Sequence, residues 1–220
     1  MRLPRSLSCL VLALGLALPS TAQASARAPL GGGSVLQSSA ATRCTAGFAA
    51  VQGKVGYLIA SSACGKPGDT IRSAGRVVGV VAAAQVPPTG AIVIRVTNTT
   101  DWRLVGSIPP TDGRVTITGS VEAPVGASVC KYGATTGWRC GTVQAKNVSI
   151  TFPEGTLTGL TRTSVCAEPG DNGGPFVSGA QAQGVLIGGS GNCSSGGSSY
   201  FFPINRVLSA YGLTILAGPN

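Results

Sequence analysis

The stretch Gly170-Asp171-Asn172-Gly173-Gly174-Pro175 is the most informative part of the sequence for both fold and chemistry. Its glycines let the backbone turn tightly and present adjacent amide hydrogens to a bound group, which is how an oxyanion hole is built. A side chain at Asn172 would project from that turn toward the same group. Most glycine-rich turns are only turns, so the surrounding residues decide which interpretation holds.

A long series of flanking residues matches one family of bacterial proteins. Downstream of residue 158 the matching residues are Gly159-Leu160-Thr161-Arg162-Thr163, Val165-Cys166-Ala167-Glu168-Pro169-Gly170-Asp171, Gly173-Gly174-Pro175, Gly188-Gly189-Ser190-Gly191-Asn192-Cys193-Ser194-Ser195-Gly196-Gly197 and Leu208-Ser209-Ala210-Tyr211-Gly212. Upstream they are Arg43-Cys44-Thr45-Ala46-Gly47-Phe48, Gly133-Ala134-Thr135-Thr136-Gly137-Trp138 and Cys140-Gly141. On these residues the chain resembles the chymotrypsin-like bacterial serine proteases of the streptogrisin and alpha-lytic protease type. The resemblance implies an all-β fold of two six-stranded antiparallel β-barrels packed face to face, with a cleft between them.

The residue pattern also favours an all-β fold. Short β-branched stretches alternate with Gly, Pro, Asn and Asp, which is typical of a barrel or a sandwich. The predicted strands are Lys54 to Ile59, Gly75 to Val81, Ala91 to Val96, Arg114 to Thr118, Val143 to Thr151 and Gln183 to Ile187. Ile204 to Tyr211 has helical character, because it follows Pro203 and ends at Gly212. We therefore expect one short C-terminal helix.

The first 24 residues read as an export signal. Arg2 and Arg5 precede an apolar run from Leu7 to Leu18, and Ala22-Gln23-Ala24 is a small-x-small cleavage site. The alternative, a membrane anchor, is disfavoured because the run is short for a bilayer and no second span follows. We expect a secreted, extracellular protein with no membrane span. A flexible, Gly- and Ser-rich arm is predicted for 25–42, followed by one double-barrel domain at 43–220.

Seven cysteines are present, and Cys9 would leave with the signal. Six cysteines in an oxidising compartment indicate three bridges, of which sequence alone allows 15 connectivities. The resemblance implies the pairings Cys44–Cys64, Cys130–Cys140 and Cys166–Cys193. No metal site or cofactor is expected, because C-x-x-C spacing is missing and the sequence contains no histidine.

The chain is basic. Its formal charge of +9 becomes 14 − 7 = +7 once Arg2 and Arg5 are removed with the signal. Such a charge favours anionic surfaces, but the basic residues are scattered singly, so nucleic-acid binding is not predicted.

Three positions that carry catalysis in the family are replaced here. The family's serine in Gly-Asp-Ser-Gly-Gly-Pro corresponds to Asn172, and its histidine before a cysteine corresponds to Ala63 within Ala60 to Cys64. The family's aspartate aligns with Gly90, or with Thr89 after a one-residue shift, and neither is acidic. A general base that activates a hydroxyl is usually histidine. The resemblance therefore predicts a catalytically inactive homologue.

A fourth replacement agrees with these three. The family has a serine at the position of Ile187, where it supports the buried aspartate. We expect Ile187 to fill part of the space left by the missing imidazole and carboxylate, which would otherwise be a destabilising cavity. A substitute Ser–Lys pair built on Lys54, Lys66, Lys131 or Lys146 is conceivable, but nothing in the spacing of these lysines indicates one.

Binding positions are retained. The resemblance places oxyanion-hole amides at Gly170 and Asn172, and a peptide-pairing strand at Ile187, Gly188 and Gly189. It places pocket walls at Ala167-Glu168-Pro169, Gly188-Gly189-Ser190 and Gly196-Gly197-Ser198. It also implies a buried basic partner for Asp171, for which Lys131 is the candidate.

Three functions are compatible with these residues. The first is a monomeric, secreted protein that binds an extended peptide or a protein protease inhibitor and so acts as a decoy. The second is a serine-type endopeptidase with residual or altered activity. The third is an envelope-associated structural protein that binds anionic polymers. Ordinary completion of the barrel would explain the pocket segments equally well.

Overall fold

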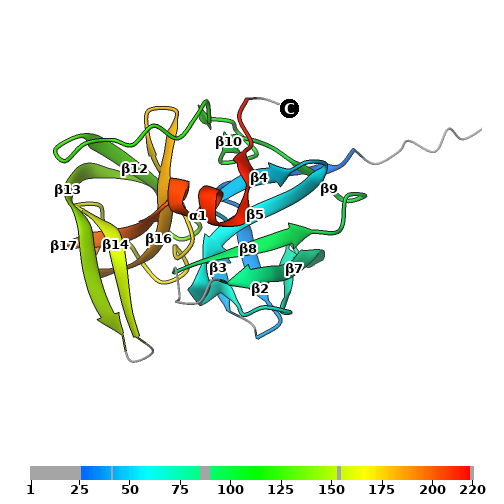
Figure 1. The fold of residues 1–220 in the computed structure, drawn as a ribbon, viewed down its shortest axis with the longest axis horizontal. Coiled ribbons are helices and arrows are strands. Elements are labelled where there is room, and N and C mark those ends of the chain that lie inside the picture. Colours follow the sequence, from blue (N-terminus) through cyan, green and yellow to red (C-terminus); the bar gives the residue numbers. More distant parts are fainter. Residues whose placement is uncertain (1–25, 41, 85–89, 153–154, 219–220) are drawn as a thin grey trace, which may run out of the picture.

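The computed structural model of the protein describes residues 26–40, 42–84, 90–152 and 155–218. The predicted export signal at 1–24 lies outside the described residues, as does Thr89. Figure 1 shows two β-sheet lobes side by side, with the C-terminal helix at their junction. No helix in the described part of the chain is long and apolar enough to cross a membrane.

The N-terminal lobe is one eight-stranded sheet in the order β18-β4-β5-β8-β7-β6-β2-β3. Its strands are β2 (Val35–Ser38), β3 (Arg43–Thr45), β4 (Phe48–Gln52), β5 (Val55–Ser61), β6 (Thr70–Ser73), β7 (Arg76–Ala84), β8 (Ala91–Val96) and β18 (Thr214–Ile215). Leu36, Leu58 and Ile94 are fully buried inside this lobe. The lobe has eight strands where six were expected, because the C-terminal strand β18 joins one edge and the β2–β3 hairpin extends the other.

The C-terminal lobe is a closed six-stranded barrel in the order β12-β13-β14-β17-β16-β15. Its strands are β12 (Ser128–Gly133), β13 (Gly137–Phe152), β14 (Gly155–Thr163), β15 (Pro175–Ser178), β16 (Gln181–Asn192) and β17 (Gly196–Pro203). Phe176 and Phe201 pack inside it with ring centroids 4.9 Å apart. The ends of β13 and β14 project from the barrel as a long hairpin (Figure 1).

Shorter elements complete the fold. β1 (Ala28–Leu30) pairs in parallel with β9 (Trp102–Leu104), and β10 (Ser107–Ile108) pairs with β11 (Val115–Thr116). A 3₁₀ helix, η1, spans Ser62–Cys64. Helix α1 spans Ile204–Tyr211 as predicted and ends at Gly212, which is left-handed and donates its N–H to Leu208 O. The predicted all-β, two-lobed fold with one short C-terminal helix is therefore confirmed.

The predicted flexible arm is wrong for the described residues 26–40. These residues form β1 and β2, and Leu30 and Leu36 are fully buried among the N-terminal core residues. The sequence rule failed because small Gly- and Ser-rich segments lack a period of their own. Here the order comes from pairing with strands far along the chain, namely β9 and β6.

The two lobes share a continuous apolar contact. Phe48, Ile59 and Val93 of the N-terminal sheet belong to the same buried cluster as Val185 and Ile187 of the barrel. This contact fixes η1 and the start of β8 against the loop that precedes β15. The glycine-rich turn at 170–174 lies in that loop, so it sits where the lobes meet.

Candidate functional site

The turn at 170–174 is held in a tight conformation by its own backbone. Gly170 and Gly173 have φ values of +95° and +87°, which side chains other than glycine rarely adopt. Asp171 N–H donates to Glu168 O at 3.0 Å, and Gly174 N–H donates to Asp171 O at 2.9 Å. The turn is thus rigid before any ligand is bound.

Thr45, which the sequence analysis did not single out, fastens this turn to the N-terminal lobe. Its N–H donates to Asn172 O at 2.9 Å, and its hydroxyl donates to Gly170 O at 2.8 Å while accepting from Ala134 N–H at 2.9 Å. The side chain is fully buried. On the opposite side Gly173 N–H donates to Leu186 O at 2.8 Å, so β3 and β16 flank the turn.

The carbonyl oxygens of Gly170 and Asn172 both accept hydrogen bonds from Thr45. The backbone N–H groups of the same two residues are in a different situation. Within the part of the chain that the structure describes, neither N–H donates to a protein acceptor. Asn172 itself is half-buried. Two amide donors with one residue between them, on a hydrogen-bonded turn and without a protein partner, are suited to donate to a carbonyl or carboxylate oxygen.

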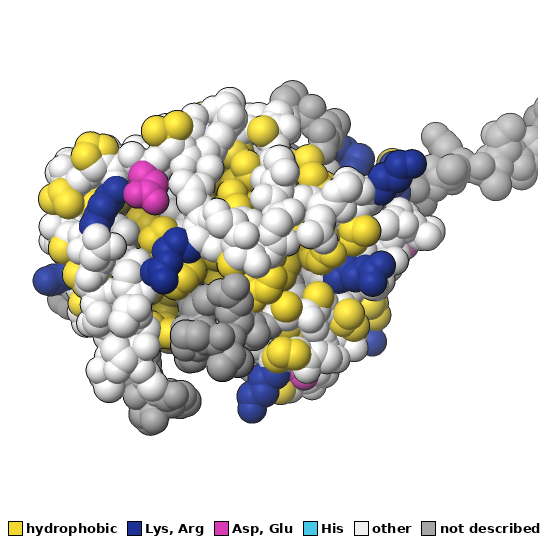
Figure 2. All heavy atoms as spheres, in the orientation of Figure 1, with side chains coloured by type: hydrophobic (Ala, Val, Ile, Leu, Met, Phe, Trp, Pro, Cys, Tyr) yellow, Lys and Arg dark blue, Asp and Glu magenta, His cyan; other side chains and the backbone are white. Residues whose placement is uncertain are grey.

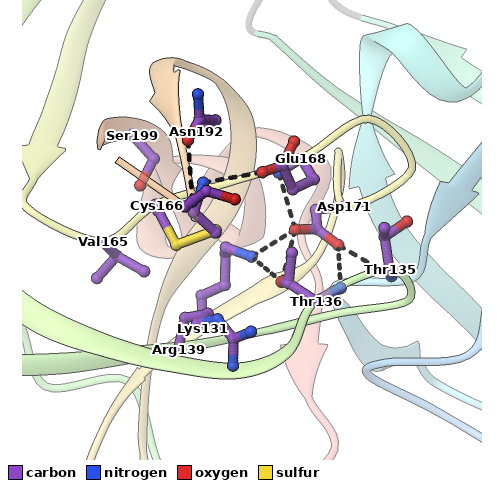
Figure 3. The surroundings of a disulfide bond; sticks show 12 residues. Lys131, Thr135, Thr136, Arg139, Val165, Cys166, Glu168, Asp171, Asn192 and Ser199 are labelled. Atoms are coloured by element: carbon purple, nitrogen blue, oxygen red, sulfur yellow. Dashed lines mark hydrogen bonds and ion pairs between the residues drawn. A yellow bond between two sulfur atoms is a disulfide. The ribbon is translucent and has the colours of Figure 1, made fainter. Parts of the chain in front are cut away.

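The side chain of Asp171 points into a buried network (Figure 3). The predicted partner Lys131 is present, with its Nζ 2.7 Å from Asp171 Oδ2 and both side chains fully buried. The Thr136 hydroxyl accepts from Lys131 at 2.8 Å and donates to the same carboxylate at 2.7 Å. Backbone N–H groups of Thr135, Thr136 and Glu168 also donate to Asp171 at 3.0–3.1 Å. Every oxygen of this buried carboxylate is therefore hydrogen-bonded.

The pair perturbs both pKa values downward. Burial lowers the pKa of Lys131, and the hydrogen bond that Lys131 donates to Asp171 offsets only part of this effect. For Asp171 burial alone would raise the pKa, but the hydrogen bonds and charge of Lys131 and the hydroxyl of Thr136 together hold it below the usual value. The 2.7 Å contact between Lys131 Nζ and Asp171 Oδ2 gives the turn a buried ion pair.

The structure brings together the three positions that the sequence resemblance aligns with the family's catalytic residues. Ser62, next to Ala63, donates its N–H to Gly90 O at 2.8 Å. A Cβ placed on Gly173, next to Asn172, would stand 3.0 Å from Ser61 N and 3.2 Å from Cys64 Sγ. Residues 61–64, 90 and 172–173, far apart in the sequence, therefore meet at one place between the lobes.

The space beside Gly90 is filled by apolar side chains. A Cβ on Gly90 would lie 3.0 Å from Ile187 Cδ1 and 3.2 Å from Leu157 Cδ1, tighter than most real contacts. Gly90 also has a φ of +72°, which disfavours any residue with a side chain. Ile187 is only 8% exposed. The expected placement of Ile187 against this position is observed, and Leu157 is an additional contact that sequence analysis missed.

This packing yields a stability prediction. Ile187→Ala should lower the free energy of unfolding by about 3 kcal/mol, because it removes buried methylenes and leaves a cavity. Urea unfolding with the disulfides intact measures the change. Val125→Ala, at a 57% exposed valine, is the control and should cost less than about 0.5 kcal/mol. A cost below about 1 kcal/mol at Ile187 would show that the site tolerates an empty space.

The edge of β16 next to the turn is paired on one side only among the described residues. Gly188 and Gly189 pair with Tyr200 and Ser199 of β17, whereas β15 pairs with β16 only as far as Val185. A Cβ on Gly188 would meet no atom within 4 Å, so the space in front of this residue is open. The edge is therefore accessible to an added strand.

The predicted pocket walls lie around this edge. Glu168 accepts from Cys193 N–H at 2.8 Å, and Ser190 and Ser198 hydroxyls are 3.0 Å apart across β16 and β17. All three bridges implied by the resemblance are present, and Cys166–Cys193 ties the residue before Ala167 to the turn between β16 and β17 (Figure 3). These contacts fix the walls without filling the space at Gly188.

Two of the four lysines considered as substitute bases have side-chain partners. Lys131 is bound to Asp171 and Thr136, and Lys146 Nζ lies 3.1 Å from Glu122. Lys54 and Lys66 are exposed on turns of the N-terminal lobe. No serine hydroxyl accepts from any of these lysines within the described residues.

Comparison with known proteins identifies the family. The trypsin family model matches residues 99–210. Streptogrisin-C of Streptomyces griseus is 45% identical over 201 residues, which is 90% of this chain and 43% of that protein. Glutamyl endopeptidase 2 of the same organism is 31% identical over 84% of this chain and 98% of its own length. This chain thus spans less than half of streptogrisin-C but nearly all of the endopeptidase.

A solved protease structure supports the same family assignment. Protease A of Thermobifida fusca superimposes with a TM-score of 0.79 at 43% identity, covering 87% of this chain and all of that one. The family match, the sequence identities and the superimposed fold lead to one conclusion. The chain belongs to the trypsin-like family of chymotrypsin-fold serine endopeptidases, close to its streptogrisin and alpha-lytic protease-type members.

Proposed function

We propose that this chain is an exported, non-catalytic relative of the streptogrisin-type endopeptidases that binds an extended peptide, such as the exposed loop of a protein protease inhibitor. The observation that carries the proposal is the contrast within one site. The positions of the family's acid and base are small or packed with apolar groups, whereas the peptide-binding edge and its amide donors are free.

Loss of catalysis is supported by both residue type and space. Asn172 has no hydroxyl to act as nucleophile, Ala63 cannot accept a proton, and histidine is missing from the whole sequence. A Cβ at residue 90 would already stand 3.0 Å from Ile187 Cδ1 and 3.2 Å from Leu157 Cδ1, so an acidic side chain there would be crowded. In a related enzyme, loss of the triad costs about 10⁶ in turnover, which the remaining amide donors do not restore.

Peptide binding is supported by the free edge of β16 and by the amides of the turn, because neither depends on catalytic residues. A peptide laid along Ile187, Gly188 and Gly189 would gain main-chain hydrogen bonds as an added strand. One of its carbonyls would then reach the N–H groups of Gly170 and Asn172. Its side chain would enter the open space at Gly188, between walls fixed by the Cys166–Cys193 bridge.

Export is supported by the three disulfides, which persist in oxidising compartments. A decoy for protease inhibitors would act in that compartment, because the inhibitors and their target proteases meet there. The two alternative functions are an envelope-associated protein that binds anionic polymers through its basic surface and an endopeptidase with residual activity. Binding and cleavage measurements on the same protein distinguish them.

The test mixes oxidised protein comprising residues 25–220 with protein inhibitors of streptogrisin-type proteases in a calorimeter, alongside a fluorogenic peptide assay. We expect a dissociation constant of about 1 μM or lower, without cleavage. Gly188→Val should weaken binding at least tenfold, because its side chain would occupy the open space while meeting no protein atom at its Cβ.

Each other outcome contradicts part of the proposal. Lack of both binding and cleavage would refute peptide binding, and salt-sensitive retention on anionic polymers would then support the structural alternative. Cleavage that persists in independently purified preparations would refute the non-catalytic assignment.

A further inference from the structure

Two arginines and a glutamine form a row across three strands beside the turn. Gln37 of β2 lies directly opposite Arg43 of β3 on one side and Arg72 of β6 on the other. Directly opposed residues project from the same face of a sheet. Neighbouring strands are about 4.8 Å apart, so the two arginine Cα atoms are roughly 10 Å apart. Long guanidinium side chains can span that gap around one small anion.

The row borders a surface hollow of about 270 Å³. Its lining includes Val35, Gln37, Arg43, Arg72, Ser73 and Gly75. Arg72 is oriented by one hydrogen bond, from its Nη1 to Gly75 O at 3.1 Å. A guanidinium has five N–H donors, so most of those on Arg72 stay available.

The hollow adjoins the candidate site. A Cβ on Gly170 would stand 3.5 Å from Arg43 Nη1, which places this guanidinium next to the glycine whose amide is free. β3 and β16 flank the turn on opposite sides, as the contacts Thr45 N–Asn172 O and Gly173 N–Leu186 O establish. A peptide that leaves the β16 edge and crosses the turn therefore arrives at Arg43.

Charge in this region is unbalanced. The ion pairs found among the described residues are Lys131–Asp171 and Lys146–Glu122, neither of which involves Arg43 or Arg72. Asp69, three residues before Arg72, accepts instead from Ser39 Oγ and Lys66 N–H. On the face drawn in Figure 2 the Lys and Arg side chains are scattered over the surface and do not form one patch. The arginine row is thus a pair of uncompensated cations around a hollow.

We infer that the hollow between Arg43 and Arg72 binds a carboxylate of the peptide that occupies the cleft, beyond the residue held by the Gly170 and Asn172 amides. Planar guanidinium groups match a carboxylate in geometry and form charge-assisted hydrogen bonds with it. Gln37 between them can donate a further hydrogen bond. The identity of the peptide as ligand rests on the proposed function, whereas the carboxylate site itself does not.

The experiment uses N-acetylated, C-terminally amidated nonapeptides that carry one Glu at successive positions, each matched by a Gln peptide. We expect one position at which Glu binds roughly tenfold more tightly than Gln. Arg43→Gln and Arg72→Gln should each remove most of this preference. Arg162→Gln, an equally charge-reducing change at an exposed position of β14, should leave it intact. Raising NaCl from 0.05 to 0.5 M should reduce it.

A second measurement separates this inference from the proposed function. N-acetylglutamate amide is titrated into ¹⁵N-labelled protein while the side-chain Nε–H signals of Arg43 and Arg72 are followed. Shifts of both signals support the carboxylate site even if no nonapeptide binds, in which case only the peptide-binding function falls. Equal binding of Glu and Gln peptides, or unchanged arginine signals, would overturn the inference. A terminal carboxylate is the bound group if a C-terminal acid peptide outcompetes every internal Glu peptide.

Discussion

Combining Asn172→Ser, Ala63→His and Gly90→Asp is expected to leave peptide hydrolysis at background, whereas adding Ile187→Ser should raise it at least about 100-fold. General acid–base catalysis contributes about 10²–10⁴ in rate, but only when the base is held within hydrogen-bond reach. In the triple variant the Cβ of the new aspartate would stand 3.0 Å from Ile187 Cδ1 and 3.2 Å from Leu157 Cδ1, so these side chains crowd the carboxylate that has to orient the imidazole. Removing Ile187 opens that space and restores the hydroxyl that the family has there.

The backbone adds a second obstacle. Gly90 has a φ of +72°, and an aspartate forced into it would be strained by about 1–2 kcal/mol. We therefore expect both variants to unfold at lower urea concentration than the parent protein. Activity should be scored per folded molecule.

Controls make this result specific. A quadruple variant with Asn172→Ala in place of Asn172→Ser must lose the gain and must not react with a fluorophosphonate probe. If the triple variant matches the quadruple one, Ile187 is no obstacle to the triad. If the parent protein reacts with the probe, the proposed loss of catalysis is wrong.

Local chemistry explains why part of this molecule was predictable from its sequence. Helix α1 was predicted residue by residue, because Pro203 and Gly212 are short-range signals at its two ends. Strand β8 has the predicted bounds, Ala91 to Val96, because a run of β-branched residues is also a short-range signal. The three bridges and the Lys131–Asp171 pair followed from the family resemblance.

Long-range pairing explains the rest. The segment 26–40 was expected to be loose, yet its order depends on β9 and β6, which no local pattern reveals. Thr45 binds Gly170 from 125 residues away, and Leu157 meets Gly90 across the two lobes. The arginine row depends on the strand order β6-β2-β3, so Arg43 and Arg72 could not be associated from spacing alone.

The buried ion pair leads to the second large effect. Lys131→Met should lower the free energy of unfolding by about 3–5 kcal/mol, because it leaves the carboxylate of Asp171 buried without its counter-charge. Asp171→Asn should cost a similar amount, since it leaves an ammonium in the same position. The double variant should recover much of the loss. The amide oxygen introduced by Asp171→Asn can still accept from the backbone N–H groups of Thr135 and Thr136, which bind Asp171 Oδ1 in the parent protein and which an apolar side chain would leave unpaired.

Acid titration tests the same pair independently. Because the folded state lowers the pKa of Asp171, the unfolded chain takes up this proton at a higher pH than the native protein. The contribution of the carboxylate is therefore fully present above about pH 4 and is lost as the pH falls through the lowered pKa. The difference in unfolding free energy between the parent protein and Asp171→Asn should shrink over that range.

An exposed pair provides the matched control. Lys146 and Glu122 lie 3.1 Å apart with side chains 30% and 53% exposed, so Lys146→Met should change stability by no more than about 0.5 kcal/mol. If Lys131→Met is equally mild, water must reach the pair in solution, and the turn at 170–174 is less rigid than its hydrogen bonds indicate. If it is severe and also abolishes inhibitor binding, the ion pair holds the free amides of Gly170 and Asn172 in place, since Asp171 lies between them.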